Sequence, residues 1–250
     1  MARTRLDVAL VERGLAETRA AAQRLVMAGL VFSNDRRLDK AGHGVETDTP
    51  LEVRGQPHPY VSRGGLKLEK ALDHFALPVA GRIALDVGAS TGGFTDCLLQ
   101  RGAAKVYAVD VGTNQLAWKL RDDPRVVSME RTNIRDVTAT QIPEPIDLVV
   151  CDASFIGLRT ALPAALALAT AGAHLVALIK PQFEVGKGRV GKGGIVREPE
   201  LHQEVCDMIS HWLEEQPSWR VLGVTESPIT GAEGNKEFLI AGHFGGQVSG

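Results

Sequence analysis

The feature that most constrains the fold is an alternation of short apolar runs with helical patterns, which begins near residue 83. Strands that alternate with helices are typical of a parallel sheet covered by helices on both faces. The apolar runs predict strands over residues 83–87, 106–109, 126–129, 146–151, 175–179, 220–224 and 238–241. The helical patterns predict helices over residues 67–75, 95–100, 115–120, 161–169 and 200–214. We therefore expect a doubly wound α/β domain with a seven-stranded, Rossmann-like sheet.

A small α+β domain is expected ahead of this sheet. The sequence predicts short helices over residues 6–11 and 19–28 and short strands over residues 30–33 and 51–53. Thr18 is a typical N-cap residue, and Gly14 and Gly29 are typical of helix ends. Pro57 and Pro59 then favour an extended chain. The predicted organisation is a first domain over residues 1–56, a linker over 57–62 and the α/β domain over 63–246.

Composition excludes several classes of protein. The 28 Lys and Arg residues against 30 Asp and Glu give a net charge of -2, so nucleic acid could be bound only through a local patch. The 3 cysteines and 7 histidines show no ligand spacing, which argues against a disulfide scaffold and predicts no metal site. The chain starts with no apolar signal segment, and we expect a cytoplasmic protein.

The uncharged stretch over residues 160–179 is long enough to span a bilayer. It is mostly alanine, and Pro163, Gly172 and His174 interrupt it. We interpret it as a buried helix near residues 161–170 that stops at Gly172, followed by a core strand over 174–180. No stable membrane insertion is expected from it.

A glycine-rich turn follows the first predicted strand, in the run Asp86-Val87-Gly88-Ala89-Ser90-Thr91-Gly92-Gly93-Phe94. Such a turn lets the backbone approach a ligand at a helix N-terminus, and Asp110, at the end of the next strand, can accept both hydroxyls of an adenosine ribose. Ser90 replaces the middle glycine of a dinucleotide fingerprint, and the Asp86 carboxylate suits the ammonium group of S-adenosylmethionine better than a pyrophosphate. The turn favours S-adenosylmethionine over a nicotinamide cofactor, and a glycine turn without any ligand stays an alternative.

A second glycine-rich run, over residues 186–193, is close to the pattern of a phosphate-binding loop. Gly193 stands where that loop needs a Ser or Thr hydroxyl, and no helix is expected to start there. We interpret this basic segment as a substrate clamp after the fifth strand, with a solvated surface loop as the alternative.

Charged residues fall at the edge of the sheet where the strands end. They are Asp152 after the fourth strand, Lys180 after the fifth, Glu237 at the start of the last, and Lys67 on the helix before the first. A lysine there can take the proton of a hydroxyl or stabilise an alkoxide while carboxylates orient it, which suits methylation of an alcohol. Methylation of an amine usually needs an Asn/Asp-Pro-Pro-aromatic turn, which is missing after Asp152. Methylation of a pyrimidine carbon needs a cysteine, but Cys151 alternates with Asp152 and is expected to be a buried apolar residue.

Six runs of the sequence support a more specific interpretation when they are taken together. They are Arg5-Leu6-Asp7, Val11-Glu12-Arg13-Gly14-Leu15, Ala28-Gly29-Leu30-Val31, Val61-Ser62-Arg63-Gly64-Gly65-Leu66-Lys67-Leu68, the turn from Asp86 to Thr95, and Leu178-Ile179-Lys180-Pro181-Gln182-Phe183. The combination resembles the TlyA family, whose members are known both as hemolysins and as ribosomal RNA 2'-O-methyltransferases, over essentially the whole chain.

The resemblance implies an RNA-binding domain of the ribosomal-protein-S-four type, followed by an FtsJ-like, S-adenosylmethionine-dependent methyltransferase domain. It implies that the acceptor is the 2'-hydroxyl of a cytidine ribose in ribosomal RNA or ribosomal subunits. Two segments depart from the family. In the linker, His58 and Tyr60 stand where some members have an arginine and a tryptophan, and the turn Ser33-Asn34-Asp35 lacks the asparagine–glycine pair common in such domains.

The residue chemistry and the resemblance together predict three groups of site residues. The matching motif positions imply the catalytic tetrad Lys67, Asp152, Lys180 and Glu237. The expected donor site comprises Asp86, Gly88, Ser90, Thr91, Gly92, Gly93, Phe94, Asp110 and Asn133. The expected RNA-binding residues are Arg3, Arg5, Arg19, Gln23, Arg24 and Arg63. The alternatives are a membrane-active hemolysin and a non-catalytic RNA-binding factor in ribosome assembly, and the sequence indicates no oligomeric state.

Overall fold

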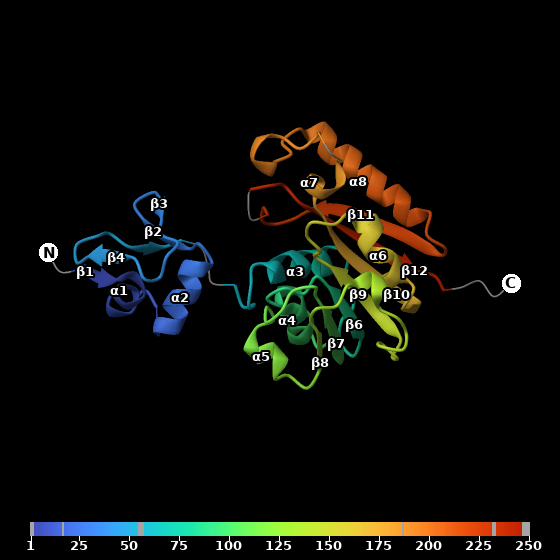
Figure 1. Ribbon diagram of the computed structural model, residues 1–250, viewed down its shortest axis with the longest axis horizontal. Coiled ribbons are helices and arrows are strands. Elements are labelled where there is room, and N and C mark those ends of the chain that lie inside the picture. Colours follow the sequence, from blue (N-terminus) through green and yellow to red (C-terminus); the bar gives the residue numbers. More distant parts are fainter. Residues whose placement is uncertain (1–2, 17, 55–57, 187, 232–233, 247–250) are drawn as a thin grey trace. The chain divides into compact units, whose positions relative to one another are not determined.

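Two separate sets of contacts divide the chain into the units Met1–Pro59 and Tyr60–Gly250 (Figure 1). The computed structural model describes residues 3–16, 18–54, 58–186, 188–231 and 234–246. The predicted linker over residues 57–62 includes residue 57, which lies outside the described residues. The domain boundaries given by the sequence therefore stay a prediction.

The first unit is a small α+β domain. Its elements are β1 Arg3–Arg5, α1 Leu6–Glu12, α2 Arg19–Met27, β2 Val31–Ser33, β3 Arg36–Arg37, β4 Gly44–Glu46 and β5 Glu52–Val53. β1 pairs with β4, and β2 lies between β3 and β5 in a second small sheet. Leu6 and Leu10 of α1 pack with Leu25 and Val26 of α2 to form its core. The predicted N-cap is confirmed, because the Thr18 hydroxyl accepts a hydrogen bond from the Ala21 N–H at 3.1 Å.

The second unit is built on a sheet with the strand order β11-β12-β10-β9-β6-β7-β8. The strands are β6 Ile83–Val87, β7 Lys105–Val109, β8 Val126–Met129, β9 Ile146–Cys151, β10 Ala169–Ile179, β11 Trp219–Glu226 and β12 Phe238–Phe244. Strands β8, β7, β6, β9 and β10 are parallel, whereas β12 runs antiparallel to both of its neighbours. The predicted seven-stranded α/β fold is confirmed, with one strand reversed.

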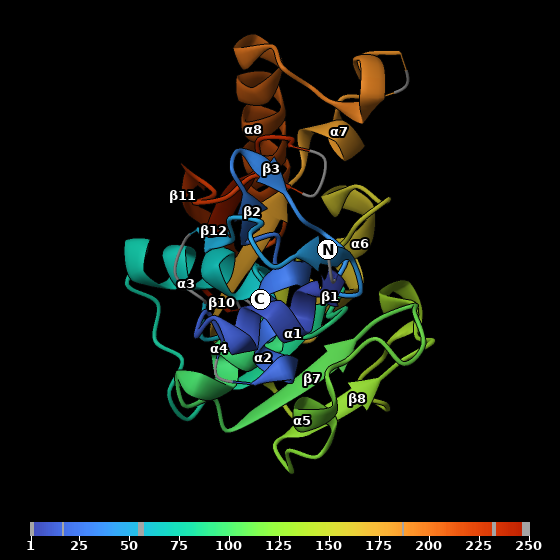
Figure 2. The ribbon, with the colours of Figure 1, turned by 90° about the vertical axis from the view of Figure 1, so that its left-hand side faces the viewer.

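Helices cover both faces of this sheet. α3 Gly64–His74 and α4 Gly93–Gln100 pack together on one face, and α6 Leu158–Leu166 and α8 Pro199–Glu214 lie on the other. Figure 2 shows the two ends of the sheet, with α8 near β11 and the short helix α5, Trp118–Arg121, near β8. The remaining short helices are α7 Pro181–Glu184, η1 Ile134–Asp136 and η2 Lys192–Gly194. Each face of the sheet therefore has its own apolar core, one beneath α3 and α4 and one beneath α6 and α8.

The helix predicted over residues 115–120 is largely wrong. The structure has a loop until Trp118, because the Glu130 carboxylate accepts hydrogen bonds from the backbone N–H groups of Asn114 and Gln115. These bonds hold the segment to the end of β8 and replace the hydrogen bonds of a longer helix.

The predicted helix end at Gly172 is also wrong. α6 ends at Leu166, and Gly172 lies inside β10, where its φ is +84° and the register between β10 and β9 shifts. Gly172 thus allows an irregularity within the strand and does not end a helix. The predicted core strand from His174 onward is confirmed.

The uncharged stretch over residues 160–179 is divided between α6 and β10. Within the described ranges, no helix has the length and apolar character needed to cross a membrane. Cys151 is fully buried in the core beneath α6 and α8, as predicted.

Candidate active site

The strand register brings three charged residues to one edge of the sheet. Cys151 of β9 pairs with Ala177 of β10, so Asp152 and Lys180 leave the sheet in the same direction. β12 is antiparallel, and its first residue, Phe238, pairs with the last residue of β10, Ile179. Glu237 therefore lies beside Lys180 in the register, although it precedes its strand instead of following it.

Buried Lys180 forms an ion pair with the partly exposed side chain of Asp152. Its Nζ lies 2.7 Å from Asp152 Oδ1, 3.3 Å from the Asp152 carbonyl oxygen and 2.8 Å from the Ser154 hydroxyl. The amine thus has three oxygen partners, one of which is an alcohol. The sequence did not single out Ser154, and only its place two residues after Asp152 could have indicated it.

A second ion pair joins Lys67 and Glu237. Lys67 Nζ donates to Glu237 Oε2 at 2.6 Å, and both side chains are buried. Lys67 projects from the start of α3. A Cβ built on Gly64, the first residue of α3, would lie 3.8 Å from Asp152 Oδ2, so this end of the helix lies against the first ion pair.

Asp86 lies at the base of the glycine-rich turn and is fully buried. Its Oδ2 accepts a hydrogen bond from the Thr95 hydroxyl at 2.6 Å, while its buried Oδ1 has no hydrogen-bond partner within the described chain. Burial raises the pKa of Asp86 to about 7, and the nearby Asp152 and Asp110 carboxylates add to the increase. A buried acceptor without a partner is the feature expected where a cationic group binds.

Asp110 is held at the neighbouring strand end by two backbone groups. Its Oδ2 accepts the Ser90 N–H and its Oδ1 accepts the Gly112 N–H, each at 2.7 Å. Each carboxylate oxygen has a second lone pair, so both can still accept a hydroxyl. The carboxylate therefore joins the glycine-rich turn to the loop after β7, as a ribose-binding residue would.

Most of the other predicted donor residues belong to the same turn. Ser90 and Thr91 are exposed, whereas Gly92, Gly93 and Phe94 are buried. Gly92 has a φ of +98°, and a Cβ there would lie 2.3 Å from Leu120 of α5. Asn133 caps η1, since its Oδ1 accepts the Arg135 N–H at 3.1 Å.

Side-chain contacts hold the basic segment over residues 186–193 and the residues that follow it; Lys187 lies outside the described residues. Arg189 forms an ion pair with Glu204 of α8. Buried Asn235 accepts the Val196 N–H at 3.0 Å and donates to the Gly194 carbonyl at 2.9 Å. Asn235 thus connects the residues just after this segment to the start of β12, a contact that the sequence does not indicate.

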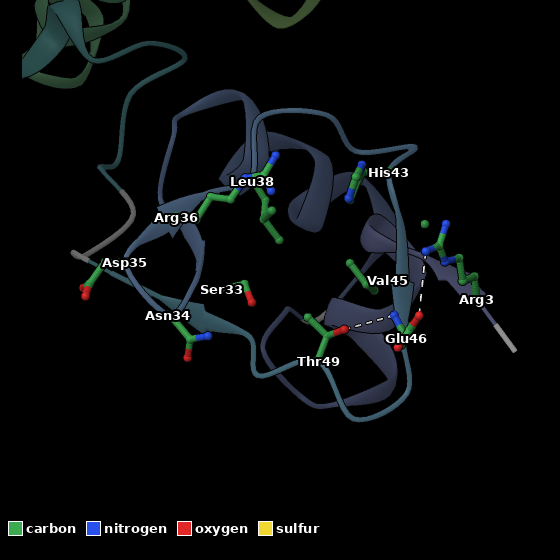
Figure 3. A pocket seen from close by; sticks show the side chains of 11 residues that line it. Arg3, Ser33, Asn34, Asp35, Arg36, Leu38, His43, Val45, Glu46 and Thr49 are labelled. Atoms are coloured by element: carbon green, nitrogen blue, oxygen red, sulfur yellow. Dashed lines mark hydrogen bonds and ion pairs between the residues drawn. The ribbon is translucent and has the colours of Figure 1, made fainter. Parts of the chain in front are cut away.

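Four of the five predicted RNA-binding residues of the first unit contact carboxylates. Arg5, Arg19 and Gln23 all donate hydrogen bonds to the buried carboxylate of Asp7. Arg3 lies 3.7 Å from Glu46 and lines a hollow of about 570 Å³ beside the β2–β3 turn (Figure 3).

The other two predicted RNA-binding residues are exposed. Arg24 lies in the last turn of α2. In the second unit, Arg63 donates to the Thr230 carbonyl at 2.9 Å.

Gly88 sets the distance between the glycine-rich turn and the segment that holds Asp152. Its φ is +81°, and a Cβ would lie 2.9 Å from the Ala153 Cα. We expect Gly88→Ala to lower the free energy of unfolding by about 2 to 3 kcal/mol, from backbone strain and the backbone clash together. Urea unfolding measures this change.

Gly81→Ala is the matched control for this prediction. Gly81 has a similar φ of +75°, but a Cβ there would meet no atom within 4 Å. Its expected loss is about 1 kcal/mol, from backbone strain alone. Equal losses in the two variants would contradict the close approach at Gly88.

Comparisons with known proteins show the family of each unit. Residues 60–244 match the family model of the FtsJ-like methyltransferases, and residues 4–49 match the S4 domain. The chain is 54% identical over 245 residues to YqxC of Bacillus subtilis, whose name proposes rRNA methylation, covering 97% of this chain and 86% of the relative. It is 48% identical over 239 residues to the 16S/23S rRNA (cytidine-2'-O)-methyltransferase TlyA of Mycobacterium tuberculosis, covering 95% and 89%.

A solved structure from Streptococcus thermophilus, described under the name hemolysin, is similar over nearly the whole chain. It superposes with a TM-score of 0.76 at 47% identity and covers 98% of this chain and 89% of the other. These matches span both units. The chain therefore belongs to the FtsJ-like methyltransferase family and, by its additional S4 domain, to the TlyA group of methyltransferases within it.

Proposed function

We propose that this enzyme transfers the methyl group of S-adenosylmethionine to the ribose 2'-hydroxyl of a cytidine in ribosomal RNA. The observation that supports this most directly is the contact of Lys180 Nζ with the Ser154 hydroxyl at 2.8 Å, beside the glycine-rich turn. The edge of the sheet thus already accommodates an alcohol next to an amine. The cytidine acceptor follows from the name of the Mycobacterium tuberculosis relative.

The donor site fits the groups of S-adenosylmethionine. The free Oδ1 of Asp86 suits its ammonium group, the Asp110 carboxylate suits its ribose hydroxyls, and Asn133 suits the neighbourhood of the adenine. Bound there, S-adenosylmethionine supplies an activated methyl group on a sulfonium. Gly88 and Gly92 allow the positive φ angles of the turn and its close packing against Ala153 and Leu120, which would give the turn its shape beside the donor.

Lys180 is the proposed catalytic group. Its amine would replace the Ser154 contact with the substrate 2'-hydroxyl and hold or accept the hydroxyl proton as the oxygen becomes a nucleophile. Asp152 orients this amine through the 2.7 Å ion pair. Lys67, fixed by Glu237, would steady the substrate with its positive charge.

The S4 domain would supply affinity for the RNA backbone. Arginines that contact phosphates position an enzyme on RNA without reading its sequence. A target nucleotide must leave its stack to reach the donor, at a cost of about a few kcal/mol that phosphate contacts can offset. We place this activity in the cytoplasm, on ribosomal RNA or ribosomal subunits.

The test is methyl transfer from labelled S-adenosylmethionine to ribosomal subunits that lack the modification, followed by digestion to nucleosides. The expected product is labelled 2'-O-methylcytidine from one or both subunits. Label on a base would contradict the lysine mechanism. If neither subunit is labelled, the result would contradict the proposed acceptor and favour an RNA-binding assembly factor.

The hemolysin name of the Streptococcus thermophilus protein gives the second candidate function. Release of a dye from liposomes by the purified chain tests it directly. Leakage without methyl transfer would overturn the methyltransferase proposal.

The raised pKa of Asp86 predicts how donor binding depends on pH. Only the ionised carboxylate attracts the donor's ammonium group, and the pKa of Asp86 in the free protein is about 7. Donor affinity should therefore rise by about tenfold per pH unit below 7 and level off above it. Calorimetric titration with S-adenosylmethionine between about pH 5.5 and 8 measures this.

Asp86→Asn is the matched variant for this pH dependence, because it keeps the shape and removes the titration. It should bind the donor more weakly and show no rise toward pH 7. An unchanged pH profile in Asp86→Asn would assign the titration to another group. The same raised pKa also means that the folded protein holds a proton that the unfolded chain loses near the ordinary carboxyl pKa of 3.8, so stability should fall as the pH rises from about 4 to about 7.

A further inference from the structure

Asp7 is a fully buried carboxylate in the first turn of α1. Its backbone N–H donates to the Ala41 carbonyl at 3.0 Å, which fixes α1 against the segment before β4. Three side chains surround the carboxylate. Arg5 Nε donates to Oδ1 and Arg5 Nη2 to Oδ2, each at 3.0 Å, while Arg19 Nε donates to Oδ2 at 2.9 Å and Gln23 Nε2 to Oδ2 at 2.8 Å.

This arrangement keeps Asp7 ionised. The Arg5 guanidinium, with the hydrogen bonds from Gln23 and Arg19, lowers the pKa of Asp7 far below its usual range despite the burial. The two arginines and the carboxylate together carry one net positive charge. That charge is exposed, because the side chains of Arg5 and Arg19 are 51% and 56% accessible.

The arginines use only part of their hydrogen-bonding capacity on Asp7. Arg19 donates through Nε, and within the described residues its two Nη groups have no hydrogen-bond partner. Arg5 likewise has Nη1 left over. The donors that remain belong to guanidinium groups whose orientation is already set by a buried acceptor, and guanidinium N–H groups match the oxygens of a phosphate.

We propose that Asp7 is a positioning residue that holds Arg5 and Arg19 as one preformed site for a phosphate of the RNA backbone. Free arginine side chains lose rotamer freedom when they bind, and this loss weakens binding. Asp7 removes much of that loss before RNA arrives. The proposal rests on the proposed function in so far as RNA is the ligand.

The positioning role and simple charge attraction predict opposite changes in RNA affinity when Asp7 is replaced. Asp7→Asn removes a negative charge next to an RNA-binding surface, and charge attraction alone would then tighten RNA binding. Loss of the preformed site should instead weaken it. Asp39→Asn removes the same charge from an exposed side chain of the same unit and serves as the matched control.

The experiment measures binding of the full chain to purified ribosomal subunits at several salt concentrations, together with the kinetics of methyl transfer. We expect Asp7→Asn to weaken binding by about tenfold, since two arginines lose their fixed orientation. The loss should appear in KM for the subunits and not in kcat, and donor binding should stay unchanged. Asp39→Asn should bind as tightly as the parent protein or more tightly.

Binding by Asp7→Asn that is equal to or tighter than that of the parent protein would overturn the positioning role. If the variant loses the thermal transition of the first unit, Gln23→Ala gives the answer instead. It removes one neutral donor to Asp7 and should weaken subunit binding by about two- to threefold without changing the charge. Unchanged binding in Gln23→Ala would then overturn the proposal. Failure of the parent protein itself to bind subunits would instead refute the proposed RNA substrate.

Discussion

Lys180→Ala should lower kcat for methyl transfer by about a thousandfold while leaving the affinity for S-adenosylmethionine unchanged. The variant removes the amine that contacts Ser154 and Asp152, and a positioned acid–base group contributes about 10²- to 10⁴-fold to a rate. Single-turnover transfer to ribosomal subunits measures the chemical step, and calorimetry measures donor binding.

Two further variants separate proton transfer from charge. Lys180→Arg keeps a positive charge, but a guanidinium does not give up its proton, so we expect it to be nearly as inactive as Lys180→Ala. Lys236→Ala is the control, because Lys236 is exposed just before β12 and pairs with Glu226 at the end of β11. Full activity in Lys180→Arg would show that Lys180 acts through charge alone. Full activity in Lys180→Ala would refute its catalytic role.

Lys67→Met should lower the free energy of unfolding of the second unit by about 3 to 5 kcal/mol. The substitution leaves Glu237, which is 3% exposed, as a buried carboxylate without its cationic partner. Lys70→Met, on the exposed side of the same helix, should change stability by less than about 0.5 kcal/mol. Denaturant unfolding followed by tryptophan fluorescence measures both variants.

The double variant Lys67→Met/Glu237→Gln tests the reason for this loss. It removes both charges and should recover most of the stability, because no unpaired charge remains buried. Methyl transfer should stay impaired, since the proposed substrate contact is missing. Equal instability in the single and double variants would mean that packing around Lys67, and not charge pairing, explains the loss.

The sequence predicted the fold because its strand and helix signals are local. The apolar runs of the central strands and the capping residue Thr18 act within a few positions along the chain. The loop at Asn114 and the irregular strand at Gly172 could not be predicted in this way. Their conformation depends on Glu130 and on β9, which lie elsewhere in the sequence.

The same distinction applies to the site. The position of Lys180 at a strand end was readable from the sequence, because parallel strands end at a common edge. The partners Ser154, Thr95 and Asn235 became apparent only through their distances to Lys180, Asp86 and Gly194. Hydroxyl and amide side chains have many possible partners, so sequence alone does not assign them.

The reversed strand β12 has a consequence for the order in which the enzyme becomes complete. β12 follows β11 in the sequence, yet it lies between β10 and β11, and within the described residues β11 joins the sheet only through it. A nascent chain therefore holds β11 without a partner until residues 238–244 have left the ribosome. Glu237 arrives at the same moment. Truncation of the messenger shortly before this point would thus remove both strand pairings of β12 together with the ion-pair partner of Lys67.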